Sequence, residues 1–229
     1  MPLNKRTGNM FSFVTHTWNP ISGICPHNCA YCYMKNMRKQ YPKLNEPLHF
    51  NRSYLKDNLG ENNYIFIGSS TDIFCKQVEN DWLLHTFAKA IGYNNKYLLQ
   101  TKNPIRYLKH LDDFIPSKFV FSTTIETNYF FPKIMNNCPA PYKRIMAMMA
   151  LPKEYKRMVT IEPIIQFDLT ELIAMVMSIN LEQINIGADS DNNGLLEPSG
   201  KETKKLIEIL EKYTTVEIKP NLERILKGV

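Results

Sequence analysis

The chain has 229 residues, 44% of them hydrophobic and 22% charged, with a formal net charge of +6. These values are typical of an ordinary globular protein with one sizeable core, and they exclude a low-complexity chain. We expect a single domain over residues 1–229. No apolar run approaches the roughly 18 residues that a membrane span requires, and residues 1–10 lack the apolar stretch of a signal peptide, so we expect a cytoplasmic protein with no membrane partner.

Short apolar runs rich in β-branched and aromatic residues predict a series of buried strands. The runs are continuous rather than alternating, which is typical of a parallel sheet covered by helices. The predicted strands cover residues 11–14, 64–68, 96–101, 119–124, 158–161, 184–187 and 215–218.

Segments with a helical period separate these strands. An apolar stripe over residues 83–91 predicts one helix, and Asn103 followed by Pro104 predicts the start of another. Capping-box patterns begin two more helices, at Asp168 and Ser199. This alternation predicts an α/β fold, either an open doubly wound sheet or a partial (β/α)6 TIM-type barrel with parallel strands. Both layouts place function at the carboxyl ends of the strands.

Three of the five cysteines lie close together in a loop that follows the first predicted strand: Cys25, Cys29 and Cys32. This spacing indicates a metal site in a reducing compartment rather than a disulfide framework. Three thiolates can converge on a four-iron, four-sulfur cluster and leave one iron open to a small molecule. A zinc site completed by His27 or His16 is the alternative.

The pattern Cys25-x-x-x-Cys29-x-Tyr31-Cys32 resembles the motif of the radical S-adenosylmethionine superfamily, in which an aromatic residue precedes the third cysteine. The order of predicted strands is similar to the six-stranded partial barrel of that superfamily. Four further segments resemble a branch of it that is carried by phages and prokaryotes, and the spore photoproduct lyases are a more distant comparison. These segments are residues 17–20, 67–74, 99–102 and 161–163.

The resemblance implies two cofactors and the residues that hold them. The three motif cysteines would ligate a [4Fe-4S] cluster, and S-adenosylmethionine would bind its fourth iron, with Tyr31 close to the adenine. Asp72 would take the place of an acidic residue that this family usually carries at the end of its second strand. The remaining implied cofactor contacts are Gly68, Ser69, Ser70, Thr124, Glu126 and Glu162.

The same resemblance implies radical chemistry. Reductive cleavage of S-adenosylmethionine would give a 5'-deoxyadenosyl radical that abstracts hydrogen from substrate, and the electron would come from a flavodoxin- or ferredoxin-type donor. Cys75 could return a hydrogen atom to the substrate radical, as a cysteine does in the photoproduct lyases, or it could be a packing thiol. The positive charge and the resemblance favour a nucleic acid or nucleotide as substrate, and a peptide or a small metabolite is the alternative.

Predictions also follow for one more cysteine and for two lysines at strand ends, and a second function is possible for the chain. Cys138 lies in an irregular, proline-flanked stretch, where we expect a surface or loop position. Lys102 and Lys219 end strands and could hold a phosphate or a carboxylate, or be solvated. The alternative function, from another class, is a non-catalytic nucleic-acid-binding protein that carries zinc or an iron–sulfur cluster.

Overall fold

A computed structural model describes residues 3–228 of the chain. Its main sheet has eight strands in the order β1-β2-β5-β6-β7-β8-β9-β10. Only the β1–β2 pair is antiparallel, and every other neighbouring pair is parallel. The strands are β1 (Asn4–Lys5), β2 (His16–Trp18), β5 (Tyr64–Ile67), β6 (Lys96–Thr101), β7 (Phe119–Thr124), β8 (Lys156–Ile161), β9 (Gln183–Ile186) and β10 (Thr215–Ile218). A separate two-stranded sheet pairs β3 (Ile21–Ser22) with β4 (His49–Phe50).

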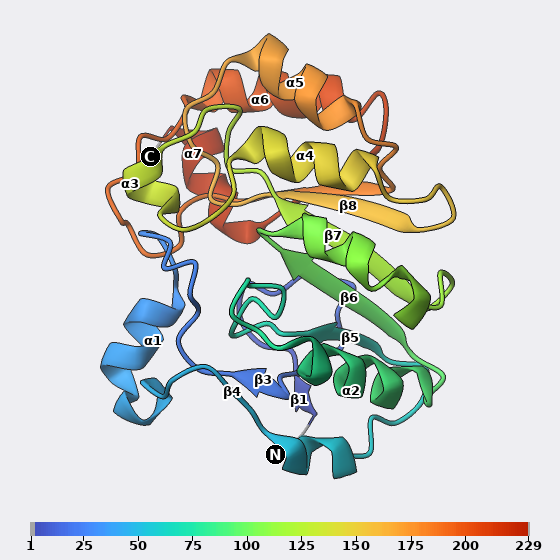
Figure 1. Cartoon of the computed structure of the whole chain (residues 1–229). Coiled ribbons are helices and arrows are strands. Elements are labelled where there is room, and N and C mark those ends of the chain that lie inside the picture. Colours follow the sequence, from blue (N-terminus) through green and yellow to red (C-terminus); the bar gives the residue numbers. More distant parts are fainter. Residues whose placement is uncertain (1–2, 229) are drawn as a thin grey trace.

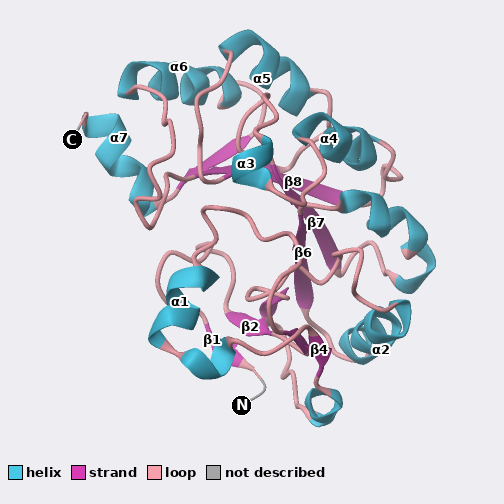
Figure 2. Ribbon diagram, turned by 60° about the vertical axis from the view of Figure 1, so that its left-hand side comes forward, coloured by secondary structure: helices cyan, strands magenta, loops and turns pink. Residues whose placement is uncertain are grey.

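The longer helices form an arc on the outside of the curved sheet (Figures 1 and 2). Because the parallel strands follow one another in chain order, the arrangement is a partial barrel and not a doubly wound sheet. The sheet does not close, and with β10, a strand that the sequence predicted, it has seven parallel strands where a (β/α)6 barrel has six. The helices are α1 (Met34–Gln40), α2 (Asn80–Ile91), α3 (Pro132–Met135), α4 (Pro141–Met149), α5 (Leu169–Met177), α6 (Gly200–Leu210) and α7 (Glu223–Lys227). Short 3-10 helices cover Pro42–Leu44, Arg52–Lys56, Pro104–Lys109, Leu111–Asp113 and Pro220–Leu222.

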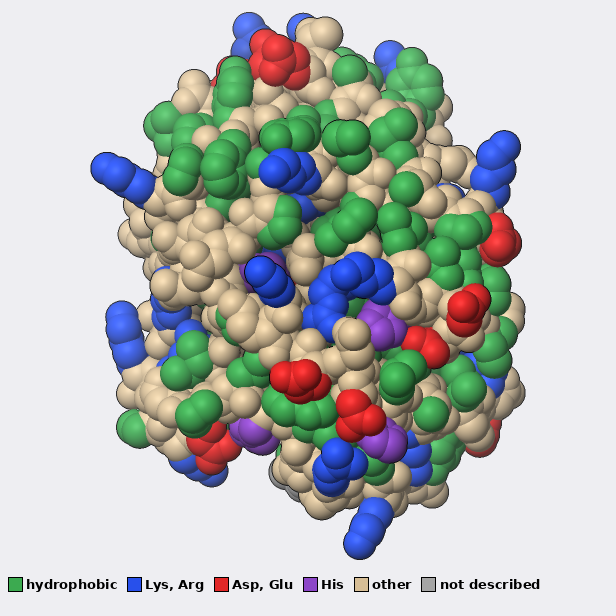
Figure 3. Space-filling model, in the orientation of Figure 1, with side chains coloured by type: hydrophobic (Ala, Val, Ile, Leu, Met, Phe, Trp, Pro, Cys, Tyr) green, Lys and Arg blue, Asp and Glu red, His purple; other side chains and the backbone are tan. Residues whose placement is uncertain are grey.

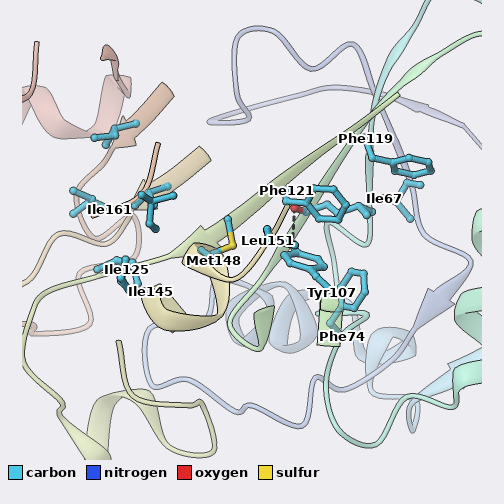
Figure 4. Close-up of a cluster of buried hydrophobic side chains, with 14 of the residues drawn as sticks. Ile67, Phe74, Tyr107, Phe119, Phe121, Ile125, Ile145, Met148, Leu151 and Ile161 are labelled. Atoms are coloured by element: carbon cyan, nitrogen blue, oxygen red, sulfur yellow. Dashed lines mark hydrogen bonds between the residues drawn. The ribbon is translucent and has the colours of Figure 1, made fainter. Parts of the chain in front are cut away.

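The main core fills the space between the sheet and the outer helices. Figure 4 shows Phe121, Tyr107 and Phe74 packed as neighbouring rings in this layer. The Tyr107 hydroxyl lies 2.8 and 2.9 Å from the carbonyl oxygens of Leu99 and Ser122, either of which can accept its proton, so its polar atom is satisfied inside the core. Burying each of these rings contributes roughly 1.5–3 kcal/mol to the free energy of folding.

The inner face of the sheet changes from apolar to polar along the strands. Near the amino ends it carries a cluster that includes Phe66, Leu98 and Met158. Because side chains alternate along a strand, the next inward positions of β6 and β8 are Gln100 and Thr160, which are hydrogen-bonded at 3.2 Å. The barrel interior is therefore apolar near the amino ends of the strands and polar near their carboxyl ends.

Residues 11–14 do not form the predicted first strand, which is instead β2. Phe11 and Val14 pack into the inner-face cluster, so this apolar run is buried by filling the barrel rather than by joining the sheet. The prediction was wrong because a short apolar run has no period that distinguishes a strand from a buried loop.

Of the three predicted helix starts that depend on a cap, two are confirmed and one is wrong. Asp168 accepts a hydrogen bond from the Glu171 backbone at 2.8 Å, and Ser199 forms a complete capping box with Glu202. Asn103 caps nothing, because its side chain donates to the Phe74 carbonyl, and the segment that follows is a 3-10 helix. Among the described helices, none is both long and apolar enough to cross a lipid bilayer.

Candidate functional site

The cysteine loop lies at the carboxyl edge of the sheet, between two other segments. On one side the Thr71 hydroxyl donates to the Gly23 carbonyl at 2.6 Å, and the Tyr33 hydroxyl donates to the Ser69 carbonyl at 2.8 Å. On the other side the Ala30 amide donates to the carbonyl of Ile134, in α3, at 2.8 Å. The loop is thus fixed by segments that follow β5 and β7.

Gly68 makes the turn that brings the first of these segments back over the strand end. Its φ is +82°, and a Cβ at this position would lie 2.5 Å from a methyl of Ile73. Only glycine adopts this conformation without strain and without displacing the neighbouring side chain. The conformation of this turn therefore requires a glycine at position 68, independently of any contact with a cofactor.

Two motif cysteines are each paired with a cysteine from elsewhere in the chain. The Sγ atoms of Cys25 and Cys75 are 3.7 Å apart, and those of Cys29 and Cys138 are 3.4 Å apart. A hydrogen bond from Cys75 lowers the pKa of Cys25 to about 7, and one from Cys138 lowers the pKa of Cys29 to about 6. Both motif thiols are thereby favoured as thiolates, the form that binds metals.

Cys138 is not at the surface, as the sequence had suggested, but only 5% exposed. It follows α3, and it shares a small buried cluster with Cys29, Tyr31 and Met135. The irregular sequence around it reflects a loop that folds inward onto the cysteine motif.

Asp72 is held in place by several hydrogen-bond donors. It lies 3.0 Å from His27 Nε2, and it accepts from the Thr101 hydroxyl and the Lys102 amide at 2.7 and 2.8 Å. Burial alone would raise the pKa of Asp72, but His27 and these hydrogen bonds lower it to about 2. The carboxylate is therefore ionised and already engaged with the protein.

His27, Asp72 and Cys75 also form a group whose ligand atoms lie within 4.8 Å of one another. This is the one arrangement among the described residues that offers a histidine next to the cysteine loop in the way a zinc site requires. His16 does not approach it, because it begins β2 and pairs with Ile65 at the amino end of the sheet.

Tyr31 is anchored by a buried ion pair. Its hydroxyl donates to Glu126, whose other oxygen accepts from Arg144 at 2.8 Å. Glu126 and Arg144 are both fully buried, and the charge of Arg144 contributes to lowering the pKa of Glu126 against the effect of burial. The ring of Tyr31 lies 5.4 Å from the Lys102 ammonium. Glu126 thus holds Tyr31 and faces no solvent.

The remaining predicted cofactor contacts line the same edge. The Ser69 hydroxyl donates to Asn19 Oδ1 at 3.2 Å, and the Ser70 amide approaches the same oxygen at 3.4 Å. Thr124, at the end of β7, faces Gln100 of β6 at 3.5 Å. These residues come from two strand ends, those of β5 and β7.

Glu162 directly follows β8. It forms an ion pair with Lys219 at 2.7 Å, so the carboxylate that Lys219 was predicted to hold belongs to the chain itself. Asn9 and Asn221 also donate to Glu162, at 2.9 and 3.1 Å. Glu162 therefore stands at the centre of its own polar cluster.

Sequence reasoning missed the buried ion pair and the polar cluster. One signal was present for the first, because Arg144 interrupts the apolar face of a helix beside Ile145 and Met148. No local signal marked Asn9 or Asn221, since both reach Glu162 from more than 50 residues away in sequence.

A family described as "Protein of unknown function (DUF5131)" matches residues 9–190. The chain belongs to this family. No curated protein matches the chain. Among solved structures, a cysteine-to-serine mutant of spore photoproduct lyase has a TM-score of 0.62 and 14% identity, covering 94% of this chain and 80% of that chain. A cysteine-to-alanine mutant with dinucleoside spore photoproduct has a TM-score of 0.62 and 13% identity, with the same coverage.

A third solved structure is a spore photoproduct lyase double mutant with bound AdoMet and dinucleoside spore photoproduct. It has a TM-score of 0.57 and 15% identity, and it covers 92% of this chain and 66% of that chain. At these identities the likeness establishes a shared fold, the partial barrel.

Proposed function

We propose that the chain is a radical S-adenosylmethionine enzyme, in which Cys25, Cys29 and Cys32 hold a [4Fe-4S] cluster. The observation that carries this proposal is the pairing of two motif cysteines with further thiols at the carboxyl edge of the barrel. The pairing favours the thiolate form needed for cluster binding. The fold shared with spore photoproduct lyase, a radical S-adenosylmethionine enzyme, supports it, as does the AdoMet bound in one of those structures.

The donor set fits the cluster better than it fits zinc. Three cysteines at this spacing supply one thiolate to each of three irons and leave the fourth iron for the cofactor. A structural zinc would need a fourth protein ligand beside the three motif thiols. Among the described residues, the candidate ligand group that contains a histidine consists of His27, Asp72 and Cys75, and it includes none of those three cysteines.

When bound, the cluster would supply one electron to the sulfonium of S-adenosylmethionine, so that the carbon–sulfur bond breaks into neutral methionine and a 5'-deoxyadenosyl radical that takes a hydrogen atom from substrate. The electron would come from a low-potential flavodoxin- or ferredoxin-type protein. The protein itself binds and orients the cofactor and the substrate, and it excludes water from the site.

The chain's own residues would orient the cofactor from several strand ends. Tyr31, fixed by Glu126, would lie against the adenine, so we assign Glu126 to positioning rather than direct contact. Asp72 is assigned in the same way, because its oxygens hold His27 and the end of β6. The residues proposed for direct contact are Tyr31, Gly68, Ser69, Ser70 and Thr124. Glu162, the remaining predicted contact, is engaged by Lys219, and we do not assign it to the cofactor.

Cys75 is proposed to return a hydrogen atom to the substrate radical. It is fully buried and lies against Cys25, so its thiol is protected from solvent and next to the metal site. The hydrogen bond with Cys25, followed by burial, raises the pKa of Cys75, which keeps its S–H bond intact. A thiol can donate a hydrogen atom only in this protonated form.

A nucleic acid or nucleotide is the proposed substrate. The dinucleoside lesion in the photoproduct lyase structures supports this choice. On the face drawn in Figure 3, Lys and Arg side chains are dispersed among apolar and polar atoms instead of forming one stripe. We therefore propose local recognition of a nucleotide rather than tracking of a long duplex.

The test is anaerobic reconstitution with iron and sulfide, followed by addition of S-adenosylmethionine and dithionite. The wild type should be brown and should form 5'-deoxyadenosine, whereas Cys29→Ala should do neither. Cys138→Ala is the matched control, because it removes a neighbouring buried thiol but no proposed ligand. A colourless protein with stoichiometric zinc would overturn the proposal in favour of a non-catalytic nucleic-acid-binding protein.

A further inference from the structure

The opening of the barrel is crossed by a segment that we name the N-terminal strap (residues 9–14). Ser12 donates its amide to Glu217 of β10 at 3.1 Å, and Phe11 packs on the inner face against Phe66 of β5. The strap therefore extends across the barrel from β10, its last parallel strand, to β5. It brings Asn9 to the carboxyl edge of the sheet.

Asn9 and Asn221 both face the Glu162 carboxylate, which fixes the orientation of their amides. A carboxylate only accepts hydrogen bonds, so the Nδ2 atoms must point toward Glu162 and the Oδ1 atoms away from it. Both Oδ1 atoms are buried, and neither has a hydrogen-bond partner. Two acceptors are thus presented without donors.

Asn185 adds a donor without an acceptor. It is fully buried on the inner face of β9, and its Oδ1 accepts from Gln183 at 2.6 Å. Its Nδ2 has no partner. Asn185 lies two residues before Gly187, on the same face of the strand, and Gly187 touches Glu162.

These unpaired atoms are unusual for a folded protein. Buried polar atoms are nearly always hydrogen-bonded, and each unpaired one costs about 1–3 kcal/mol. Gly187 leaves the space that Glu162 occupies, since a Cβ there would lie 2.7 Å from the carboxyl carbon. The Glu162 side chain is 17% exposed, so the cluster reaches the surface. Such an arrangement is typical of a binding site whose ligand completes the hydrogen bonds.

The charges and the donor pattern define the ligand. Lys219 neutralises Glu162, so the cluster offers no net charge to an ionic group. It calls for a neutral group with at least two N–H or O–H donors and one acceptor. Among the four bases, guanine has this pattern, with its amino group and ring N–H as donors and its carbonyl oxygen as acceptor, and asparagine amides read base edges through paired contacts.

Exposed aromatic side chains follow the end of β7, the strand next to β8. Tyr129 is 43% exposed and Phe130 is 45% exposed. Aromatic side chains of this kind stack on unpaired bases. Together with the net charge of +6, they favour a nucleoside of a single-stranded or flipped nucleotide over a peptide.

We propose that Asn9, Asn185 and Asn221, arranged around the Glu162–Lys219 ion pair, form the subsite that recognises the nucleobase of the substrate. We call these five residues the amide cluster. This inference rests on the proposed function for the identity of the reaction, but it concerns binding. It places the substrate base at the β8–β10 side of the barrel, whereas the cofactor's adenosine belongs beside Tyr31.

The experiment titrates the anaerobically reconstituted protein with each of the four 2'-deoxynucleosides, and separately with S-adenosylhomocysteine, by ligand-observed NMR and calorimetry. Asn9→Ala and Asn221→Ala should each weaken binding of the preferred deoxynucleoside by roughly 2–10-fold, as expected for one lost hydrogen bond. Binding of S-adenosylhomocysteine should not change. Asn45→Ala, at an exposed position, is the matched control.

Each outcome decides the inference. If both variants weaken the binding of S-adenosylhomocysteine as much as they weaken the binding of the deoxynucleoside, the cluster serves the cofactor and the proposal is overturned. If the wild type binds no deoxynucleoside, or the variants bind as well as the wild type while remaining folded by circular dichroism, it is also overturned. Formation of 5'-deoxyadenosine without substrate is measured on the wild type and on the Asn45→Ala control, where it should be the same, so failure of the proposed enzyme activity is detected separately from failure of nucleoside binding.

Discussion

The two sides of the barrel's carboxyl edge differ in which of their buried polar atoms lack a partner. On the thiol side, near β5 to β7, the carboxylates of Asp72 and Glu126 are each held by donors of the protein, and Arg144 keeps one donor nitrogen, Nη2, without a partner. On the amide side, near β8 to β10, Asn9 and Asn221 keep buried acceptor oxygens without partners. Carboxylates that are engaged by the protein can position neighbouring groups, whereas acceptors without donors can select a ligand that supplies them.

The largest expected effect lies on the thiol side. Cys25→Ala and Cys32→Ala should each lose nearly all bound iron after reconstitution, because two thiolates cannot replace three at one cluster. Cys75→Ala and Cys138→Ala should retain it, since these thiols only donate to the ligands. Iron and sulfide assays check this. Equal loss in all four variants would mean that the five cysteines form a different kind of site.

Arg144→Met should reduce the free energy of unfolding by about 3–5 kcal/mol, because it leaves the buried charge of Glu126 unpaired. The double variant Arg144→Met/Glu126→Gln should recover part of this loss, since the remaining group is neutral. Guanidinium denaturation of the apoprotein measures both. Additive losses in the double variant would contradict the pairing.

Gly187→Ala tests the amide side. The added Cβ would meet the Glu162 side chain, so we expect a loss of about 1–3 kcal/mol in unfolding free energy. In the background of Glu162→Ala the same substitution should cost much less, because the clashing atoms are gone. A double-mutant cycle over the wild type, the two single variants and the double variant gives the coupling energy between the two positions. A coupling energy near zero would mean that the Glu162 side chain does not lie against Gly187.

Asn185→Leu should have the smallest effect on the free energy of unfolding, and it should stabilise the protein rather than destabilise it. Its Nδ2 has no partner, and Gln183 would still donate to Glu217 at 3.0 Å. We therefore expect unfolding free energy to stay level or to rise by up to about 1 kcal/mol, with weaker deoxynucleoside binding. Denaturation and NMR titration together check this. A loss above about 2 kcal/mol would show that Asn185 is a structural residue.

The sequence by itself determined the class of fold and the position of the cysteine loop. Local patterns carry this information: β6, β7 and β10 coincide with the predicted runs, and the caps at Asp168 and Ser199 depend on residues three apart. The spacing of Cys25, Cys29 and Cys32 is also local, so three thiols in one loop could be recognised without a structure.

Only the tertiary structure decided what surrounds that loop. Cys138 meets Cys29 across 109 residues, and Asn9 meets Glu162 across 153. Residues 11–14 fill the barrel instead of joining the sheet, because the apolar inner face of neighbouring strands is available to cover them. Contacts of this kind arise from the packing of distant segments, which no local pattern in the chain encodes.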